Sequence, residues 1–406
     1  NISNPGQLSR TIVSGDFRAP ASDQISFDVQ RELSANIIFT VGYVRTRGTG
    51  LFQTVDGNPR LPCIFGTGPG TCNTTGVDRN TGAPLPSSAP ILAPRVDPSR
   101  GIITLRTNSA TSTYDALQAS LEKRLSRGVS FGVHYTLSSS IDTASDIFVP
   151  SVAESAVSQD PFDRNSDRAR SSYDRPNRLS GNVVYELPFF TKQRGFIGKM
   201  LGGWQVNSFF NFQTGAPLSA LNGFDPAGAN TSATAIRPNV FTNLDVSRMT
   251  VAQLYLINQQ QREPAIAQAQ QIFKALPSGP CVPGWLPGPS LPFTLFSAPR
   301  GRITCNAQGA RTFVVDFNGV PEGQRVGKAG RNIMRADPIR NVDIGIIKNT
   351  QVAENVRTQF WIDFFNAFNS RNFGIPSGVA SSPGFLNQWA TDGGNRRIRF
   401  GARLVF

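Results

Sequence analysis

Long apolar runs are absent from this chain of 406 residues, whose mean hydropathy is −0.21. No stretch of about 18 apolar residues exists, so the sequence excludes a membrane-spanning helix. Membrane-spanning strands are not excluded, because only alternate residues of such strands face lipid. The chain begins with Asn1 and shows no signal peptide, so we expect a mature product or a fragment.

Residue types that carry catalysis or bind metal are also scarce. His134 is the single histidine, which argues against a metal site built from histidines. With one histidine and no recognisable setting for an activated serine or cysteine, nucleophilic catalysis has no support. Residues 66–70, Gly-Thr-Gly-Pro-Gly, lack the Lys-Ser/Thr of a phosphate loop and are interpreted as loop sequence. We predict neither enzymatic activity nor a bound cofactor.

The C-terminal segment alternates apolar and polar residues and ends on an aromatic side chain. Successive side chains of a strand point to opposite faces, so the segment predicts one apolar and one basic face. The two rows are Ile398, Phe400, Ala402, Leu404 and Phe406, and Arg397, Arg399, Gly401 and Arg403. The row of Phe400, Leu404 and Phe406 resembles the assembly signal of bacterial outer-membrane β-barrels, which implies recognition by the barrel-assembly machinery and contact with outer-membrane lipid.

The same two-residue period recurs along the chain. It is clearest where Val129, Phe131, Val133, Tyr135 and Leu137 share one face. About nine segments have the length of a tilted membrane strand. They are residues 24–33, 36–45, 114–125, 129–138, 178–187, 204–213, 341–348, 356–369 and 398–406. We therefore predict an all-β fold, an antiparallel transmembrane β-barrel with long external loops that contain short helices.

Short and long connections alternate between these strands. The short ones are 34–35, 126–128, 190–203 and 349–355, and the long ones are 46–112, 139–177, 215–340 and 370–395. Outer-membrane barrels have short periplasmic turns and long external loops, so we expect extracellular loops and a periplasmic C-terminus. Traced backwards, the first strand also descends. This places residues 1–22 in an external loop and makes residues 23–406 the C-terminal part of a larger barrel.

Aromatic and helical patterns refine this arrangement. Tyr185 and Trp204 flank the inner turn 190–203, which we expect to hold one helical turn, whereas Tyr43 and Tyr135 lie late in ascending strands. These positions match two interfacial girdles.

The large loop 215–340 also carries helical patterns. Residues 254–257 and 265–274 predict two short helices, the second starting at Pro264. We interpret them as a packed loop subdomain rather than a partner-binding helix, since amphipathic helices mostly bury their apolar face.

The cysteines lie in Gly/Pro-rich parts of the expected external loops. Their even number suits two disulfides formed in an oxidising periplasm, and the alternative is four free thiols. Because crossing pairs would join different loops, we predict the adjacent pairings, Cys63 with Cys72 and Cys281 with Cys305.

Charged residues give two further expectations. A formal charge of +13 is typical of proteins that bind nucleic acid. No basic cluster carries stacking aromatic residues, however, so we predict no nucleic-acid binding. A basic lumen, or a rim facing lipopolysaccharide phosphates, explains the charge better. The arginines expected to line a lumen are Arg124, Arg178, Arg357, Arg399 and Arg403.

An acidic loop offers a possible calcium site. It carries Asp160, Asp163, Asp167 and Asp174, interleaved with Arg164, Arg168, Arg170 and Arg175. The spacing fits no calcium loop, so we expect local ion pairs instead of a metal.

Several motifs resemble a known family. Residues 114–125 and 128–142 resemble a hairpin of TonB-dependent receptors that have a carboxypeptidase-regulatory-like N-terminal domain, the Oar-like type abundant in Acidobacteria. Residues 174–181 (Asp-Arg-Pro-Asn-Arg-Leu-Ser-Gly), 330–332 (Gly-Arg-Asn), 364–369 (Phe-Phe-Asn-Ala-Phe-Asn) and 372–374 (Asn-Phe-Gly) extend the match. The resemblance implies a plugged barrel of about 22 strands. About thirteen strands, the plug and the TonB-coupling segment would then lie outside this chain.

Three functions are compatible with these features. The first is energised uptake of a bulky nutrient such as a siderophore, a glycan fragment or a peptide. The second is a structural or adhesive surface protein that works through its braced loops. The third, a surface enzyme, has no site to support it. A plug and coupling segment in the complete gene would favour uptake, and their absence would favour adhesion.

Overall fold

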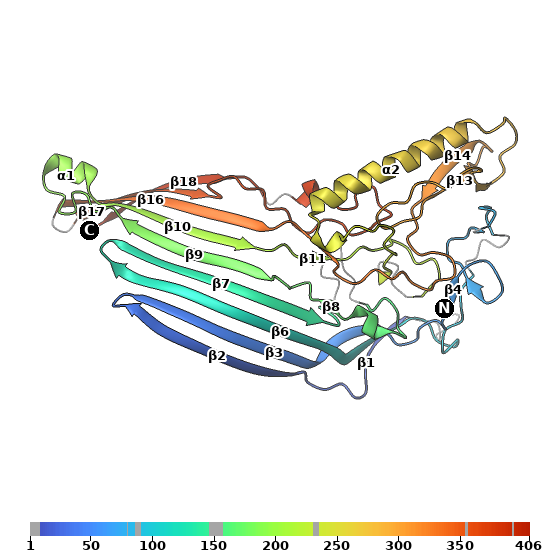
Figure 1. Cartoon of the computed structure of the whole chain (residues 1–406), viewed down its shortest axis with the longest axis horizontal. Helices are drawn as coiled ribbons and strands as arrows, with labels where there is room; N and C mark the ends of the chain where they lie inside the picture. Colours follow the sequence, from blue (N-terminus) through green and yellow to red (C-terminus); the bar gives the residue numbers. More distant parts are fainter. Residues whose placement is uncertain are drawn as a thin grey trace, which may run out of the picture.

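The computed structural model describes residues 9–78, 80–85, 91–145, 157–229, 235–353, 356–391 and 394–406. Nine strands form a continuous antiparallel wall in which spatial order follows chain order (Figure 1). They are β2 (Ala21–Ser34), β3 (Ile37–Asp56), β6 (Ile103–Ser126), β7 (Val129–Asp142), β9 (Asn177–Glu186), β10 (Trp204–Gln213), β16 (Ile339–Ala353), β17 (Val356–Phe365) and β18 (Arg397–Val405). All nine predicted strands are therefore confirmed.

The register separates two faces of this wall. Cross-strand partners share a face, and Tyr43 pairs with Phe27 on β2 and Leu117 on β6, while Phe400 pairs with Ile362. The opposite face is polar, with Ser120 facing both Thr40 and His134. The apolar face is open to its surroundings, since Phe27 and Phe400 are 69% and 73% exposed. Such a surface is stable against hydrocarbon and costly against water.

The two edges of the wall are formed by β2 and β18. They do not pair with each other within the described residues. A short strand, β1 (Arg10–Val13), pairs in parallel with the first residues of β6 at the loop end of the wall. The expected loop segment 1–22 is described only from residue 9, and residues 1–8 of that prediction lie outside the described part.

Several strands differ from their predicted bounds. β2 begins at Ala21 rather than residue 24, and β7 continues to Asp142 rather than residue 138. β16 continues to Ala353, so most of the predicted turn 349–355 is strand.

β3 and β6 continue beyond residues 36–45 and 114–125 as a long hairpin in which Asp56 pairs with Thr104. Backbone ladders need no apolar alternation, so the pattern could not reveal this extension.

β17 ends earlier than expected, at Phe365 rather than Asn369. Asn366 and Asn369 adopt φ angles of 51° and 53°. Asparagine tolerates this left-handed conformation, but a β-strand cannot continue through it.

Long connections gather at one end of the wall and pack together (Figure 1). We call this unit the loop cap, the described parts of residues 57–102, 143–176, 214–338 and 366–396. Its strands are β4 (Ile64–Phe65), β5 (Thr71–Cys72), β8 (Ala169–Arg170), β11 (Pro217–Leu218), β12 (Gly284–Trp285), β13 (Arg300–Cys305), β14 (Arg311–Asp316) and β15 (Met334–Arg335). Its helices are η2 (Arg164–Asp167), η4 (Val246–Arg248), α2 (Val251–Lys274) and η5 (Gln388–Thr391).

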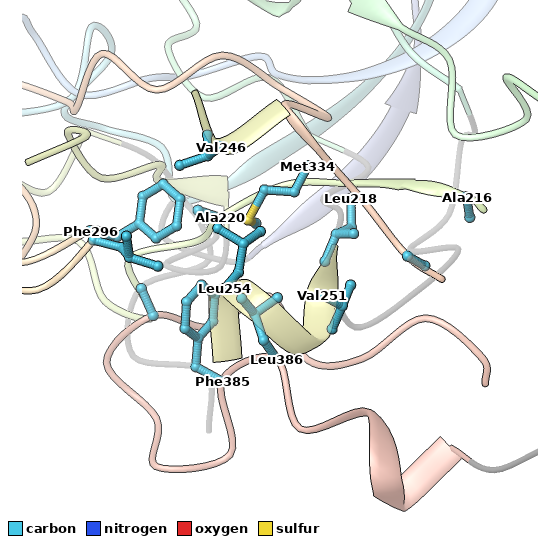
Figure 2. Close-up of a cluster of buried hydrophobic side chains, with 13 residues drawn as sticks. Ala216, Leu218, Ala220, Val246, Val251, Leu254, Phe296, Met334, Phe385 and Leu386 are labelled. Carbon is cyan, nitrogen blue, oxygen red and sulfur yellow. The ribbon is translucent and has the colours of Figure 1, made fainter. Parts of the chain in front are cut away.

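The main hydrophobic core of the protein lies in the loop cap. Val251 and Leu254 of α2 pack with Phe296, Met334 and Phe385, and all are at most 1% exposed (Figure 2). The packed interpretation of the helical segment is therefore correct.

The number of helices was predicted wrongly. One helix, α2, replaces the two expected, with Pro264 inside it. An interior proline costs about 3 kcal/mol. Burial of Ala265 and Ala269 against Leu291 offsets this cost, and a capping box of Thr250 and Gln253 fixes the helix start.

The turn end of the wall carries one further helix. α1 (Gly195–Leu201) occupies the turn between β9 and β10, as predicted. None of the described helices is long and apolar enough to cross a membrane.

Candidate functional site: the loop cap

Both disulfides lie in the loop cap, with the predicted pairings Cys63–Cys72 and Cys281–Cys305. The first closes a loop whose cysteines pack on Ala93. The second ties the end of β13 to the segment that follows α2. Each bridge stays within one long connection, because its two cysteines are only 9 and 24 residues apart.

Buried ion pairs join the loop cap to the wall. Arg331 donates to the carboxylate of Asp142 at the end of β7, and its Nε donates to the backbone oxygen of Asp167 over 2.9 Å. Asp167 in turn pairs with Arg237 at 2.6 Å, and both side chains are at most 5% exposed. We call Asp142, Asp167, Arg237 and Arg331 the junction. Breaking one buried pair leaves an uncompensated charge, so the junction holds the loops in one arrangement.

A second buried carboxylate lies beside the junction. Asp174 is fully buried and accepts hydrogen bonds from the Ser140 amide at 2.8 Å and from Arg335 at 2.5 Å. Burial lowers the pKa of neighbouring Arg175, and the nearby Arg335 guanidinium lowers it further. This carboxylate fixes the start of β9 against the loop between β10 and β16.

These contacts explain the motifs in residues 174–181 and 330–332. Asn332 has a φ of 56° and donates its side-chain amide to the backbone oxygen of Arg170 at 2.8 Å. Asp174 and Asn332, which belong to distant motifs, therefore both contact Arg170.

The prediction of local ion pairs in the acidic loop was mostly wrong. Asp174 does have a local partner, Arg170, at 3.3 Å. Asp160 instead pairs with Arg325 at 3.1 Å. The reason is that residues 157–176 pack against the 214–338 connection, whose arginines come closer than the interleaved ones. The described residues contain no group of His, Cys, Asp and Glu arranged to hold a metal.

A cavity of about 280 Å³ lies between the two disulfide-braced segments. Trp285, Phe224 and Thr74 contribute to its walls, together with Arg302 and Asp316, whose Nε and Oδ2 are 3.5 Å apart. Arg300 lies over the Trp285 ring at 4.4 Å, and burial lowers the pKa of Arg300. An aromatic wall beside both signs of charge can hold a polar organic ligand by stacking and hydrogen bonds. We call this the cap cavity.

The arginines expected to line a lumen all lie on the polar face of the wall. Arg178 pairs with Thr136 and Gln213, and Arg357 with Gln351. Arg399 forms an ion pair with Asp363 at 2.8 Å, whereas Arg403 faces Gln359. Arg124 follows Lys123, which shares the apolar face with Ile37. The ammonium of Lys123 reaches the backbone oxygens of Ser126 and Val129 at the turn, at 2.8 and 2.7 Å.

The C-terminal residues and the aromatic residues follow the apolar face. Phe400 and Leu404 pair with Ile362 and Thr358, and Phe406 is 93% exposed. Tyr185 and Trp204 lie near the turn end of this face. Tyr43 and Tyr135 lie nearer the loop end, where their hydroxyls donate to Asp115 and Asn177 at 2.6 Å each. The face therefore has an aromatic band at each end.

The sequence analysis did not identify four residues that make central contacts in the loop cap: Asp142, Arg237, Arg262 and Trp285. Arg262 is 7% exposed, lies over the Phe317 ring at 3.6 Å and donates to the backbone oxygen of Ser381 at 3.0 Å. Burial lowers its pKa. The sequence signal for Arg262 was a charged residue on the buried side of α2.

The two-faced antiparallel wall with its packed loops defines this protein as an outer-membrane β-barrel protein. The chain belongs to the family described as the outer membrane beta barrel domain, whose model matches residues 1–399. A comparison with curated proteins found no match.

Solved structures of outer-membrane proteins resemble the fold at low identity. The outer membrane transporter YddB from Escherichia coli is 10% identical with a TM-score of 0.44, and the match covers 97% of this chain and 34% of that one. For the FrpB iron transporter from Neisseria meningitidis the identity is 8%, the TM-score 0.36, and the coverages 97% and 32%. A mutant ferric enterobactin receptor from Pseudomonas aeruginosa is 7% identical with a TM-score of 0.37, and the match covers 96% of this chain and 31% of that one. This chain spans about a third of the length of these proteins.

Proposed function

We propose that this chain is the C-terminal part of a TonB-dependent receptor that imports a bulky nutrient across the bacterial outer membrane. In this proposal the loop cap is extracellular and the C-terminus periplasmic. The strand wall joins further strands into a barrel of about 22 strands. A plug and a TonB-coupling segment of the carboxypeptidase-regulatory-like type precede the chain. Phe400, Leu404 and Phe406 form the signal for the barrel-assembly machinery.

The observation that carries the proposal is the rigid loop cap with its cavity. A passive pore has no use for a core of its own, two disulfides and a buried charge junction above the wall. Ligand capture does need a surface held in one shape, because a preordered site loses less entropy on binding. The cap cavity, with Trp285 and the Arg302–Asp316 pair, suits a siderophore, a glycan fragment or a peptide.

The polar face of the wall supports passage of such a ligand. The arginines Arg124, Arg178, Arg357, Arg399 and Arg403 lie on this face, and in the proposal they line the lumen. Arg399 is partly neutralised by Asp363, so the lumen combines fixed charge with hydrogen-bonding groups. Basic groups along a channel favour an anionic cargo.

The test uses the complete gene in its native host. Uptake of labelled siderophores, oligosaccharides and peptides is measured for the wild type, for Trp285→Ala and for a gene that lacks the coupling segment. Trp389→Ala is the matched control, since Trp389 is an exposed tryptophan of the loop cap that contacts Phe373 instead of the cap cavity. We expect uptake of one cargo to be lost without the coupling segment and reduced at least tenfold by Trp285→Ala alone.

An adhesive surface protein is the competing outcome. Transport is refuted if uptake of every tested cargo persists without the coupling segment. It is also refuted if the complete gene encodes no plug. Binding of the cells to a surface or to other cells, lost when residues 246–276 are deleted, would then establish adhesion.

A further inference from the structure

A groove of about 360 Å³ runs along the outside of the wall where it meets the loop cap. Its floor is a straight row across four strands on the apolar face. Tyr135 pairs with Leu179, Leu179 with Phe212, and Phe212 with Arg340. The groove therefore has an apolar floor with a cationic end.

The loop cap forms the other side of this groove. Arg248 of η4, the segment 249–250 that leads into α2, and residues 335–339 overhang the row, and the start of α2 lies above the loop ends of the strands (Figure 1). Four charged residues line the groove, Arg248, Arg335, Asp337 and Arg340. The groove is therefore basic overall.

The three arginines of the groove differ in the ion pairs that they already form within the protein. Arg335 is committed to the buried Asp174. Arg248 makes only an exposed pair with Asp245, at 3.1 Å, and such pairs are weak. For Arg340 no ion pair is found among the described residues, although its backbone amide donates to Asn372 at 2.8 Å. Two guanidinium groups thus remain available to an anion.

Arg340 is an unexpected residue on the apolar face. An arginine there is costly at the bilayer midplane and costs little near the interface. Tyr135, at the other end of the same row, belongs to the aromatic band at the loop end. The row therefore marks the level where acyl chains end and charged headgroups begin.

The geometry points to a binding site for lipid A, the phosphorylated and acylated disaccharide that anchors lipopolysaccharide. Its phosphates would pair with Arg340 and Arg248, in the bidentate manner that guanidinium groups favour, and its acyl chains would cover Leu179 and Phe212. The groove is continuous with the lipid-facing surface, which favours a lipid over a soluble ligand. Lipid A rather than a glycerophospholipid follows from the extracellular orientation of the loop cap, on which this inference rests. It does not depend on transport.

The test measures lipid binding by native mass spectrometry of the full-length protein in detergent. The wild type and the double variant Arg340→Gln/Arg248→Gln are titrated with bisphosphorylated lipid A, monophosphoryl lipid A, phosphatidylglycerol and inorganic phosphate. Arg47→Gln is the matched control, because Arg47 is exposed, lies on the apolar-face register opposite Thr113 at the loop end, and does not line the groove. Heat-shifted electrophoretic mobility shows that each variant is folded.

We expect the double variant to bind lipid A at least tenfold more weakly than the wild type, with Arg47→Gln unchanged. Monophosphoryl lipid A should bind the wild type more weakly than the bisphosphorylated form. Equal binding by the wild type and the double variant would overturn the inference. So would phosphatidylglycerol or inorganic phosphate binding as tightly as lipid A. Uptake in the host is measured separately, so failure of the lipid site and failure of transport are distinguishable.

Discussion

Arg331 and Asp142 lie 189 residues apart in the sequence and form an ion pair in which the side chains are 7% and 6% exposed. The pair connects the loop end of β7 to the long connection between β10 and β16. Arg331 also donates to the backbone oxygen of Asp142 at 2.9 Å. One guanidinium therefore satisfies both a carboxylate and a backbone group where the wall meets the loop cap.

Arg331→Ala should destabilise the loop cap by about 3–5 kcal/mol, because it leaves Asp142 buried without its partner. Hydrogen exchange of the backbone amides in residues 139–145 and 328–334 reports this local opening. Arg100→Ala is the control, because Arg100 pairs with Asp97 in an exposed i,i+3 arrangement worth about 0–1 kcal/mol. Equal protection loss in the two variants would contradict the structural role of the junction.

Phe400→Arg should impair folding into the membrane by about 2–4 kcal/mol if residue 400 lies near the midplane. The reason is that Phe400 lies on the apolar face and is 73% exposed there. Arg399→Gln should cost much less, since the side chain is on the polar face and retains hydrogen bonding to Asp363. The yield of folded protein in membrane fractions measures both effects. Similar yields would show that the assigned faces are incorrect.

Cys281→Ser/Cys305→Ser should loosen the loop cap by about 3 kcal/mol, since the bridge closes a loop in the unfolded chain. The effect should exceed that of Cys63→Ser/Cys72→Ser, because the sequence separation is 24 residues rather than 9. The rate of trypsin cleavage of each folded variant measures which disulfide stabilises the loop cap more. Peptide mapping of the wild type without reductant checks both pairings. A peptide that links Cys63 to Cys281 would refute the pairing.

Pro264→Ala should stabilise α2 by up to about 3 kcal/mol. Pro264 is exposed inside the helix, so alanine restores a backbone donor without disturbing a packed side chain. Hydrogen exchange of the amides in residues 258–270 is the measurement. Gln270→Ala, at another exposed position of α2, should change stability by only a few tenths of a kcal/mol. A destabilised helix after Pro264→Ala would show that the proline supports the observed geometry.

The strand set was predictable because the apolar and polar faces of the wall take alternate residues of opposite polarity. Val129, Phe131 and Val133 carry this pattern in the sequence, and the ladder places them as expected. The disulfides were predictable because each pair is adjacent in the chain. The extent of the β3–β6 hairpin was not, since its outer part lacks an apolar row.

One interruption of a predicted row has a tertiary reason. Gly401 breaks the series Arg397, Arg399 and Arg403 on the polar face. Trp361 lies directly opposite on β17, and a Cβ at position 401 would approach its ring to 2.1 Å. The sequence marked the glycine, but only the register identified the side chain that requires it.

The sequence by itself determined which residues cross the membrane region and which side of each strand is apolar, because a strand has a fixed two-residue period. It also determined where chain adjacency makes a disulfide. Tertiary structure alone decided that Asp167 pairs with Arg237 rather than with a neighbouring arginine, that α2 continues through Pro264, and that Arg340 and Arg248 share one groove. The physical reason is that buried charges and packed side chains take the partners that folding brings close, and sequence distance does not encode that proximity.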